Sequence, residues 1–573
     1  MAGGLDRQAP LADVQGVNLS QLFSSSGAGD SEMRQARLRI GSLAMALAAT
    51  AVLLVARAAD LAMFAAPETV SAGVELKSDN PARARLVDRN GVLLAADIET
   101  WDVYVRRVDI DDASRLAKRL ILLDGVPPYD VLVRRFAGDR GRARIARSVT
   151  PKQRQAIFEL AEPGVEFEAK VQRIYPNGKL ASHLLGWVNA DGFGASGVES
   201  FFDERLRSNV EPLMLSLDSR VQFSLEDELK KAVILHKPVA AIGVVTHIPS
   251  GEVLAMASWP DFNPNHFSTT TPDHRRNRAL TDPYELGSVF KPLTMAMALE
   301  SGMELQKISI DVKKKLVIAG REIRDFHPGS SPMSATDILV HSSNKGAARL
   351  ALKIGAEQQQ TYLRRLGLLD PVPIELRGSA DAYMASDDWS QVKTATIGFG
   401  HGLSVTALSF VAGLSAVVND GKKLSLTVLP RPSPDTGFTQ VVSAETSLQV
   451  RRAMRKVVMD GSGRRADVPG YGVAGKTGSA EKWDPKISGY AKDRNVSSFV
   501  AVFPWESPEY LVFVLLDEPQ GGVETFGQET AGWNAAPAVR NIIARIGPLL
   551  DAPFTHPDQI PSSELSAQVE SMQ

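Results

Sequence analysis

An uninterrupted apolar run near the N-terminus, residues 40–56, constrains the architecture of this chain more than any other feature. Seventeen residues reach about 25 Å as a helix, enough to cross a hydrocarbon core if flanking side chains extend to the interface. Arg34, Arg37 and Arg39 precede the run, which predicts a cytoplasmic N-terminus and an exported remainder. A core helix would show a polar stripe, and the apolar region of a cleaved signal peptide is usually shorter. We therefore predict a retained anchor at residues 40–62, with cleavage as the alternative.

Composition excludes several classes of function. A chain of 573 residues is too long for one core and suggests two to four domains. The net charge of −2 comes from interspersed acidic and basic residues, so we expect no nucleic-acid partner. The chain has no cysteine, which excludes disulfides, thiolate metal sites and cysteine nucleophiles. Nine scattered histidines without His-Glu-x-x-His spacing predict no metal site, and we expect no cofactor.

The pattern of predicted helices and strands changes near residue 215. Before it, Asn90-Gly91 predicts a hairpin turn within residues 85–95, helical patterns occupy about 110–165, and a linker-like, glycine-containing stretch extends to 197. After it, the pattern predicts strands, then helices, then strands and a final helix near 536–546; the predicted strands are 239–246, 252–257, 472–475, 496–503 and 510–516. This order predicts an α/β domain with a mixed sheet flanked by helices. Residues 1–39 and 551–573 are polar and are expected to be flexible tails.

Ser288 is the strongest candidate nucleophile. It lies three residues before Lys291 at the start of a helical pattern, after Gly287, which allows a tight turn into the helix. Residues three apart share one helical face. A serine hydroxyl needs a base to take its proton, and a lysine is such a base only when burial or a nearby cation lowers its pKa. Backbone N–H groups at the helix start would face a developing oxyanion.

The order of three motifs separates Ser288 from chance matches. Ser-x-x-Lys occurs four times, at Ser288, Ser342, Ser390 and Ser479. Only Ser288 is followed by a Ser-x-Asn, Ser342-Ser343-Asn344, and then by the single Lys-Thr-Gly, Lys476-Thr477-Gly478. This order is the signature of penicillin-binding proteins and class A β-lactamases. A Ser-Asp-Asn at residues 78–80 precedes the nucleophile, and we interpret it as a chance match.

The second and third motifs also have structural explanations. Ser342 could be only the N-cap of the helical run that follows it, and a lysine after a strand is usually a solvated strand end. In the functional interpretation, Ser342 relays a proton to the leaving amine and Asn344 holds the substrate backbone. Lys476 supplies positive charge for a substrate carboxylate, and Gly478 lets the substrate approach the strand closely.

Together these motifs resemble those of the class B penicillin-binding proteins, specifically the division-specific D,D-transpeptidases of the FtsI type. The likeness extends from the anchor to about residue 548, and it includes further segments at 83–95, 173–178, 183–186, 197–199, 251–256, 277–279, 400–406 and 512–519. Two positions depart from the family: Leu286 stands where proline is frequent, and Ser479 stands where threonine is common. Serine keeps the hydroxyl, so the site should tolerate the second change.

The resemblance implies a domain order and a reaction. A pedestal of the penicillin-binding protein dimerisation type is expected at 63–214 and a transpeptidase domain with the penicillin-binding fold at 215–550, without a glycan-polymerising domain. Ser288 would attack stem peptides ending in D-Ala-D-Ala and would be acylated by β-lactams. The backbone N–H groups of Ser288 and Ser479 would form the oxyanion hole. Thr477, Gly478 and Ser479 would bind the substrate, with Lys476 behind them.

The resemblance also implies a location and partners. The protein would be a single-pass inner-membrane protein with its catalytic domain in the periplasm at the division septum. Its expected partners are an FtsW-type glycan polymerase and other division proteins. Small residues in the anchor, Gly41, Ser42, Ala46 and Ala49, offer a surface for helix packing in lipid.

Several rival functions share the motifs. An elongation-type class B protein would differ only in its partners, and a β-lactam sensor would be expected to have further membrane spans. A β-lactamase would need a base that activates a deacylating water. Glu322, Asp325 and Asp337 lie between the first two motifs, but we interpret each as a surface-loop or helix-start residue.

Overall fold

The structure is a computed structural model. It describes residues 41–42, 45–46, 48–52, 83–138, 141–208, 210–326, 331–384, 388–432, 437–484, 487 and 489–554. The chain divides into two compact units, residues 1–77 and 78–573. The predicted tail at 1–39 and most of the predicted anchor at 40–62 lie outside the described residues, and the described parts of the anchor are helical. Within the described ranges, no helix combines the length and the apolarity needed to span a membrane.

The predicted hairpin opens the second unit. Strand β1 (Leu86–Val87) pairs antiparallel with β2 (Leu93–Arg106), and Gly91 in the turn has a φ of 81°. The fully buried Asp88 closes the turn, because its Oδ1 accepts hydrogen bonds from the backbone of Asn90 and Val92, each at 2.8 Å. The predicted hairpin and its glycine at positive φ are confirmed, and the structure adds the role of the Asp88 carboxylate in closing the turn.

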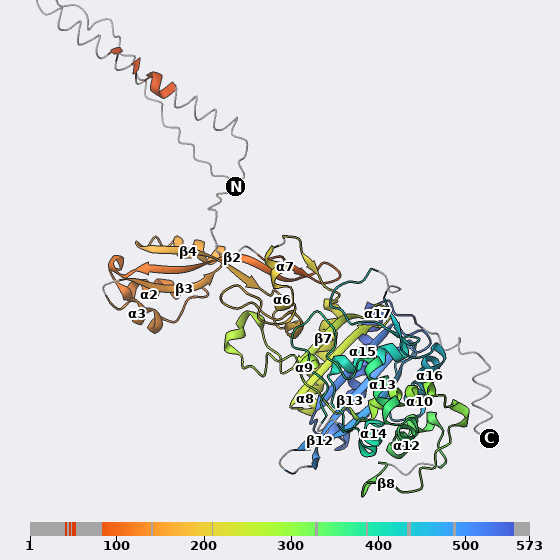
Figure 1. The fold of residues 1–573 in the computed structure, drawn as a ribbon. Helices are drawn as coiled ribbons and strands as arrows, with labels where there is room; N and C mark the ends of the chain where they lie inside the picture. The colour runs from red at the N-terminus through yellow and green to blue at the C-terminus, as the bar shows by residue number, and fades with distance from the viewer. Residues whose placement is uncertain are drawn as a thin grey trace, which may run out of the picture. The chain divides into compact units, whose positions relative to one another are not determined.

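The pedestal contains more strand than the sequence predicted. β2 pairs antiparallel with both β3 (Arg142–Val149) and β4 (Val165–Ile174), and α2 (Ala113–Leu120), α3 (Tyr129–Phe136) and α4 (Pro151–Phe158) accompany this sheet (Figure 1). The helical patterns expected over 110–165 are correct for these three helices and wrong for β3. Its alternating exposed arginines and buried Ala143, Ile145 and Val149 form an amphipathic strand over a small core.

The stretch up to residue 197 is packed structure, and the prediction of a linker there is wrong. It holds α5 (Ser182–Leu185) and leads into α6 (Gly197–Phe201). Tyr175, His183 and Leu184 are buried. Their packing is accompanied by a buried ionic network in which Glu199 on α6 receives Arg83 at 2.8 Å and Arg173 at 2.7 Å. These buried ion pairs connect α6 to Arg83 and Arg173, so a segment whose composition resembles a loop is packed in the structure.

A five-stranded sheet forms the centre of the C-terminal domain. Its order is β12–β13–β14–β6–β7, with antiparallel neighbours, and its members are β6 (Ala240–His247), β7 (Glu252–Trp259), β12 (Ala474–Asp484), β13 (Gly489–Phe503) and β14 (Tyr510–Asp517). β6, β7 and β14 match the predictions closely. β13 ends where predicted but begins seven residues earlier, and β12 begins later and extends further than predicted. Outside this sheet, β1 pairs in parallel with β5 (Leu213–Met214).

Helices cover both faces of this sheet, as the α/β prediction required (Figure 1). On one face α8 (Ser219–His236) and α17 (Ala535–Leu549) pack over a core that contains Val245, Val512 and Val514. On the other face lie α9 (Arg278–Thr281), α10 (Lys291–Glu300), α11 (Ala335–Val340), α12 (Asn344–Ile354), α13 (Ala356–Leu366), α14 (Gln391–Ile397), α15 (Ala407–Val418) and α16 (Ala444–Asp460). The remaining helices and strands are α7 (Asp203–Ser208), β8 (Leu316–Ile318), β9 (Arg321–Ile323), β10 (Lys422–Lys423) and β11 (Thr439–Gln440).

The helix that follows Ser288 lies inside the core. Eight of the ten residues of α10 are buried, and α15 beside it is buried at every position but Ser415. An element enclosed in this way has little freedom to shift, so the backbone that presents the nucleophile is fixed by packing.

Candidate active site

Ser288 lies in a short 3-10 turn, η4 (Gly287–Phe290), that runs directly into α10. Gly287 has a φ of 61°, as expected for the tight turn predicted there, and its N–H donates to the carbonyl of Gly400 at 3.0 Å. A Cβ atom at Gly287 would lie 2.8 Å from the carbonyl oxygen of Ser479. The nucleophile turn is therefore held between the segment around residue 400 and strand β12.

The amine of Lys291 connects the first two motifs. Its Nζ lies 2.9 Å from Ser288 Oγ, 3.0 Å from Ser342 Oγ and 2.8 Å from Asn344 Oδ1, and it also contacts the Ser342 carbonyl at 2.6 Å. Lys291 is 1% exposed. Burial lowers its pKa well below the usual lysine value, and the nearby Lys476 cation lowers that pKa further, while Asp325 opposes the shift. The site thus supplies an amine able to accept the Ser288 proton.

The lysine of the third motif also contacts Ser342. Lys476 is fully buried, and its Nζ lies 3.1 Å from Ser342 Oγ, 3.0 Å from the Thr477 carbonyl and 3.2 Å from Thr477 Oγ1. Burial lowers its pKa to about 7. The prediction that Lys-Thr-Gly ends a strand at 472–475 is wrong: the motif lies within β12, and contacts with Ser342 and Thr477 replace water around the lysine.

The N-terminus of α12 shows which serine of the second motif caps the helix and which contacts the lysines. Ser343 is the N-cap of α12, because its hydroxyl accepts from the N–H of Gly346 at 3.0 Å. Ser342 precedes the cap with a φ of 54°, and its side chain lies between the two lysine amines. Asn344 donates to the carbonyl of Arg324 at 3.3 Å while its oxygen accepts from Lys291. The capping explanation therefore applies to Ser343 and leaves Ser342 and Asn344 to contact Lys291.

The other residues expected to bind substrate are adjacent in β12. A Cβ at Gly478 would lie 2.5 Å from both the Leu286 carbonyl oxygen and Ser498 Oγ. The absence of a side chain at Gly478 therefore lets the segment that leads into the nucleophile turn pack against β12. Ser479 places its backbone beside Gly287, and its hydroxyl accepts from the N–H of Ala531 at 3.3 Å. The structure therefore brings the expected oxyanion-hole positions, Ser288 and Ser479, onto adjoining segments.

Sequence reasoning missed one residue of this cluster and misjudged another. Ser462 Oγ lies 2.6 Å from Thr477 Oγ1, although no motif marks it. Asp325 was predicted as a surface-loop residue, but its side chain is only 6% exposed and accepts from Ser343 Oγ at 3.0 Å and from the Lys345 N–H at 2.9 Å. Its carboxylate is therefore bound by Ser343 of the second motif and by the backbone of Lys345, the residue that follows the motif.

The other two carboxylates considered between the motifs have ordinary structural roles. Asp337 forms a capping box with Ser334 at the start of α11, as predicted for a helix-start residue. Glu322 lies on β9, where it pairs with Arg324 at 2.6 Å. Across the described ranges, no cluster of His, Cys, Asp or Glu side chains has the arrangement of a metal site.

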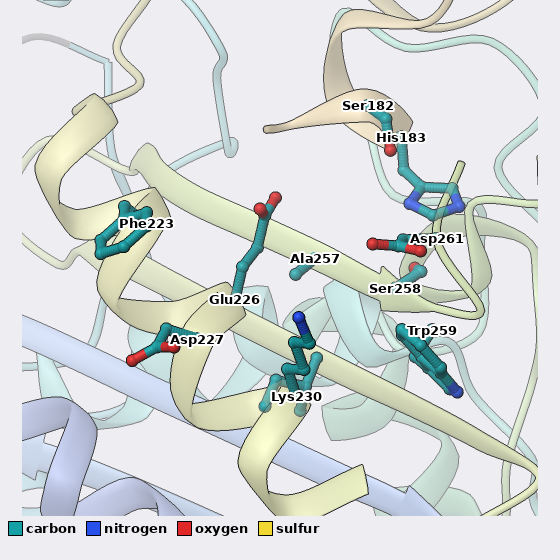
Figure 2. Close-up of a pocket in the computed structure, with 11 residues that line it drawn as sticks. Ser182, His183, Phe223, Glu226, Asp227, Lys230, Ala257, Ser258, Trp259 and Asp261 are labelled. Atoms are coloured by element: carbon teal, nitrogen blue, oxygen red, sulfur yellow. The ribbon is translucent and has the colours of Figure 1, made fainter. Parts of the chain in front are cut away.

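A separate cavity of about 200 Å³ contains none of the three motifs. Figure 2 shows Glu226 on α8 pointing into it, with His183 and Asp261 on the opposite side. Glu226 accepts from the Ala181 N–H at 2.8 Å and from Gln222 at 2.7 Å, and burial raises its pKa to about 7. We assign this cavity no part in the chemistry at Ser288.

Comparison with known proteins agrees with the geometry. Residues 241–544 match the family "Penicillin binding protein transpeptidase domain", and residues 78–228 match "Penicillin-binding Protein dimerisation domain". The probable peptidoglycan D,D-transpeptidase FtsI of Caulobacter vibrioides is 39% identical over 482 residues, which cover 82% of this chain and 81% of that protein. The chain belongs to the FtsI-type penicillin-binding proteins.

Other relatives of this FtsI-type protein share most of its length. Peptidoglycan D,D-transpeptidase FtsI of Escherichia coli is 29% identical over 476 residues, which cover 77% of this chain and 80% of that protein. Stage V sporulation protein D of Bacillus subtilis is 30% identical, with 81% and 77% covered. The crystal structure of penicillin binding protein 3 from Mycobacterium tuberculosis, complexed with aztreonam, has a TM-score of 0.64 at 25% identity and covers 83% of this chain and 98% of that one.

Proposed function

We propose that this protein is a serine-type peptidoglycan D,D-transpeptidase in which Ser288 attacks the penultimate D-alanine carbonyl of a stem peptide ending in D-Ala-D-Ala. One observation carries the assignment of residues. The Lys291 amine lies 2.9 Å from Ser288 Oγ and 3.0 Å from Ser342 Oγ, so nucleophile, base and relay form one continuous hydrogen-bonded chain. Family membership gives the reaction class, since relatives across most of the chain are named peptidoglycan D,D-transpeptidases.

Acylation begins with proton transfer from Ser288 to the neutral Lys291 amine while the Ser288 Oγ bond to the carbonyl carbon forms. The backbone N–H groups of Ser288 and Ser479 stabilise the oxyanion. As the C–N bond breaks, Ser342 donates a proton to the leaving D-alanine amine and receives one from Lys291. The ammonium of Lys476, 3.1 Å from Ser342 Oγ, favours the hydroxyl's transient negative character.

Deacylation reverses this path with a different amine. The amine of a neighbouring stem peptide attacks the acyl-enzyme and gives its proton to the Ser342–Lys291 pair, and Ser288 Oγ recovers a proton as it leaves. Asn344 is engaged with Lys291 and Arg324 in the free enzyme. Its second amide hydrogen and its second oxygen lone pair are left for the predicted contact with the substrate backbone.

The carboxylate of the terminal D-alanine would bind at β12. Thr477 and Ser479 present hydroxyls there, Gly478 keeps the strand close to Ser288, and Lys476 supplies positive charge from behind Thr477. β-Lactams would acylate Ser288 by the same path. Solved structures of penicillin binding protein 3 from Mycobacterium tuberculosis, which are complexed with aztreonam and with ampicillin, support this.

We further propose a role in cell division. FtsI-named relatives support it, while the sporulation relative and elongation-type class B proteins represent the alternative setting. The proposed arrangement has a cytoplasmic tail at 1–39, an inner-membrane anchor at 40–62, a pedestal at 63–214, a periplasmic transpeptidase domain at 215–550 and a flexible tail at 551–573. An FtsW-type polymerase and other division proteins would be its partners at the septum. Depletion should give filaments without septa, whereas rounded cells would favour elongation.

The transpeptidase assignment is tested by following both products. The membrane-extracted full-length protein should release D-alanine from a pentapeptide donor and join the donor to an added acceptor amine. Ser288→Ala should abolish both. Ser390→Ala is the matched control, since Ser390 belongs to another Ser-x-x-Lys and its hydroxyl caps α14 by accepting from the Lys393 N–H. D-alanine release that persists in the Ser288→Ala protein would contradict the assignment.

A further inference from the structure

Ser462 contacts the proposed carboxylate-binding strand without belonging to any of the three motifs. It lies between the end of α16 at Asp460 and the 3-10 turn η6 (Arg464–Ala466). Its Oγ is 2.6 Å from Thr477 Oγ1. Ser462 is exposed, whereas Thr477 is 7% exposed. The two hydroxyls therefore form a pair in which Ser462 is the member that meets solvent.

A buried cation stands directly behind this pair. The Nζ of Lys476 is 3.2 Å from Thr477 Oγ1, and the lysine is fully buried. Among the residues that the structure describes, no carboxylate forms an ion pair with Lys476; its three hydrogen-bond acceptors are neutral oxygens, Ser342 Oγ, the Thr477 carbonyl and Thr477 Oγ1. An ammonium that donates to a hydroxyl polarises it and makes it a better donor to an anion.

The nearby arginines contact other groups. Arg464 donates to the carbonyl of Asp460 at 3.1 Å, and Arg465 lies over the ring of Trp533 at 3.3 Å. Thr477 Oγ1 already accepts a hydrogen bond from Lys476. Thr477 therefore has a partner in the protein without Ser462. The hydroxyl pair offers an incoming anion two O–H groups with a buried lysine directly behind them.

We propose that Ser462 and Thr477 together bind the terminal carboxylate of the peptide substrate. The hydrogen bond between the two hydroxyls is exchanged on binding, so that each donates its one hydrogen to the carboxylate. This inference rests on the proposed function and names a specificity residue for it. The substrate carboxylate supplies the negative counter-charge to the Lys476 ammonium, whose hydrogen-bond acceptors in the free enzyme are neutral oxygens. Ser462 thus helps the enzyme to distinguish a peptide that ends in a free carboxylate from one that does not.

The test compares two ligands that differ only in this charge. Second-order acylation rate constants are measured for the full-length protein with benzylpenicillin and with its methyl ester. Ser462→Ala should slow acylation by the acid about tenfold, as expected for one lost hydrogen bond to a charged group, and leave the ester within about twofold. Ser462→Thr keeps the hydroxyl and should restore the wild-type ratio. Ser462→Gly, flanked like the parent by glycines, should repeat the alanine result.

Ser208→Ala is the matched control, because Ser208 is an exposed serine on α7 whose hydroxyl donates to the backbone carbonyl of Arg205. Equal slowing of acid and ester in Ser462→Ala and Ser462→Gly would mean a purely structural role and overturn the inference. An unchanged acid rate would also overturn it. Failure of the proposed function is distinguishable, because the wild-type protein would then not be acylated at Ser288 by either ligand.

Discussion

The two lysines of the site are chemically alike and are distinguished by what surrounds them. Both are buried, and burial disfavours the charged form of each. The positive charge of Lys476 also lowers the pKa of Lys291. Protonating Lys291 would place a second positive charge in the site, next to that of Lys476. Asp325 opposes this lowering of the pKa only partly. The arrangement favours a neutral Lys291 that accepts the Ser288 proton and a Lys476 that carries the charge.

The pH dependence of acylation should show this division of roles. The pKa of Lys476 is lowered to about 7, so its charge is present below that pH and is lost as the pH rises through it. We expect the second-order rate constant for penicillin acylation to fall on this alkaline side, and to fall at lower pH as Lys291 becomes protonated. Lys476→Arg keeps its charge and should lose the alkaline fall, whereas Lys291→Arg should lose acylation almost completely.

The measurement is the rate constant of acylation of the free enzyme by benzylpenicillin across pH 5 to 10. Lys393→Arg is a suitable control, because Lys393 occupies the lysine position of the unrelated Ser-x-x-Lys at α14. Equal loss of activity from Lys291→Arg and Lys476→Arg would contradict the different roles. An alkaline fall that survives in Lys476→Arg would show that another group titrates there.

Apolar periodicity predicted β6, β14, α17 and residues 496–503 of β13 well, since each is defined by burial of hydrophobic side chains. It failed at β12, whose residues Lys476 and Thr477 are polar and yet buried, with the Lys476 amine in contact with Ser342 of a distant motif. The motif order predicted which residues meet at the site. It could not find Ser462, which joins Thr477 only because α16 and β12 bring together positions fifteen residues apart.

Gly400 provides an element-scale prediction. Its φ is 85°, and a Cβ there would collide with the carbonyl group of Gly287 in the nucleophile turn. Gly400→Ala should therefore displace that turn and slow penicillin acylation by about a hundredfold or more, since small misplacements of reacting groups have large effects. Gly378 is the control, with a φ of 90° and open space around its Cβ position. Gly378→Ala carries the same backbone strain and should leave acylation within about twofold of wild type.

Comparable acylation rates for the two alanine variants would contradict this account, because positive φ alone would then explain the effect of Gly400→Ala. Thermal unfolding of both variants should accompany the kinetics. The backbone strain is common to both proteins, so similar melting temperatures with different acylation rates would locate the effect of Gly400→Ala in the turn.

At the scale of the whole molecule, a buried ionic network ties the first described residues to the segment before the transpeptidase domain. Glu199 is fully buried and receives Arg83 at 2.8 Å and Arg173 at 2.7 Å. Arg83 also contacts Asp203 at 2.5 Å, and Arg173 contacts Asp97 at 3.1 Å. These residues come from β2, β4, α6 and α7 and from the chain before β1, so the network fixes the base of the pedestal.

Glu199→Ala should destabilise this region strongly, because it leaves two guanidinium groups buried without their shared carboxylate. A loss of about 3–5 kcal/mol in the free energy of unfolding is expected. Asp130→Ala, which breaks an exposed pair with Arg134, should cost less than about 1 kcal/mol. Chemical denaturation measures both. Acylation of the folded protein at low denaturant should remain near wild type, and a selective loss of acylation with unchanged stability would contradict a structural role for the network.

We propose that Ser288 forms a long-lived acyl-enzyme, as a transpeptidase does and a β-lactamase does not. Among the described residues, no carboxylate hydrogen-bonds to Ser288 or Lys291 that could activate a deacylating water at the ester. A deacylation barrier of about 22 kcal/mol corresponds to a half-life of about 25 minutes at 25 °C, so persistence requires no unusual stability.

The most direct measurement labels the full-length protein with a fluorescent penicillin, maps the modified peptide and follows the label after removal of excess ligand. We expect one adduct on the peptide that contains Ser288, absent from Ser288→Ala, present in Ser390→Ala and persisting for many minutes. An adduct on the Ser288→Ala protein, or release within a second with repeated turnover, would contradict it.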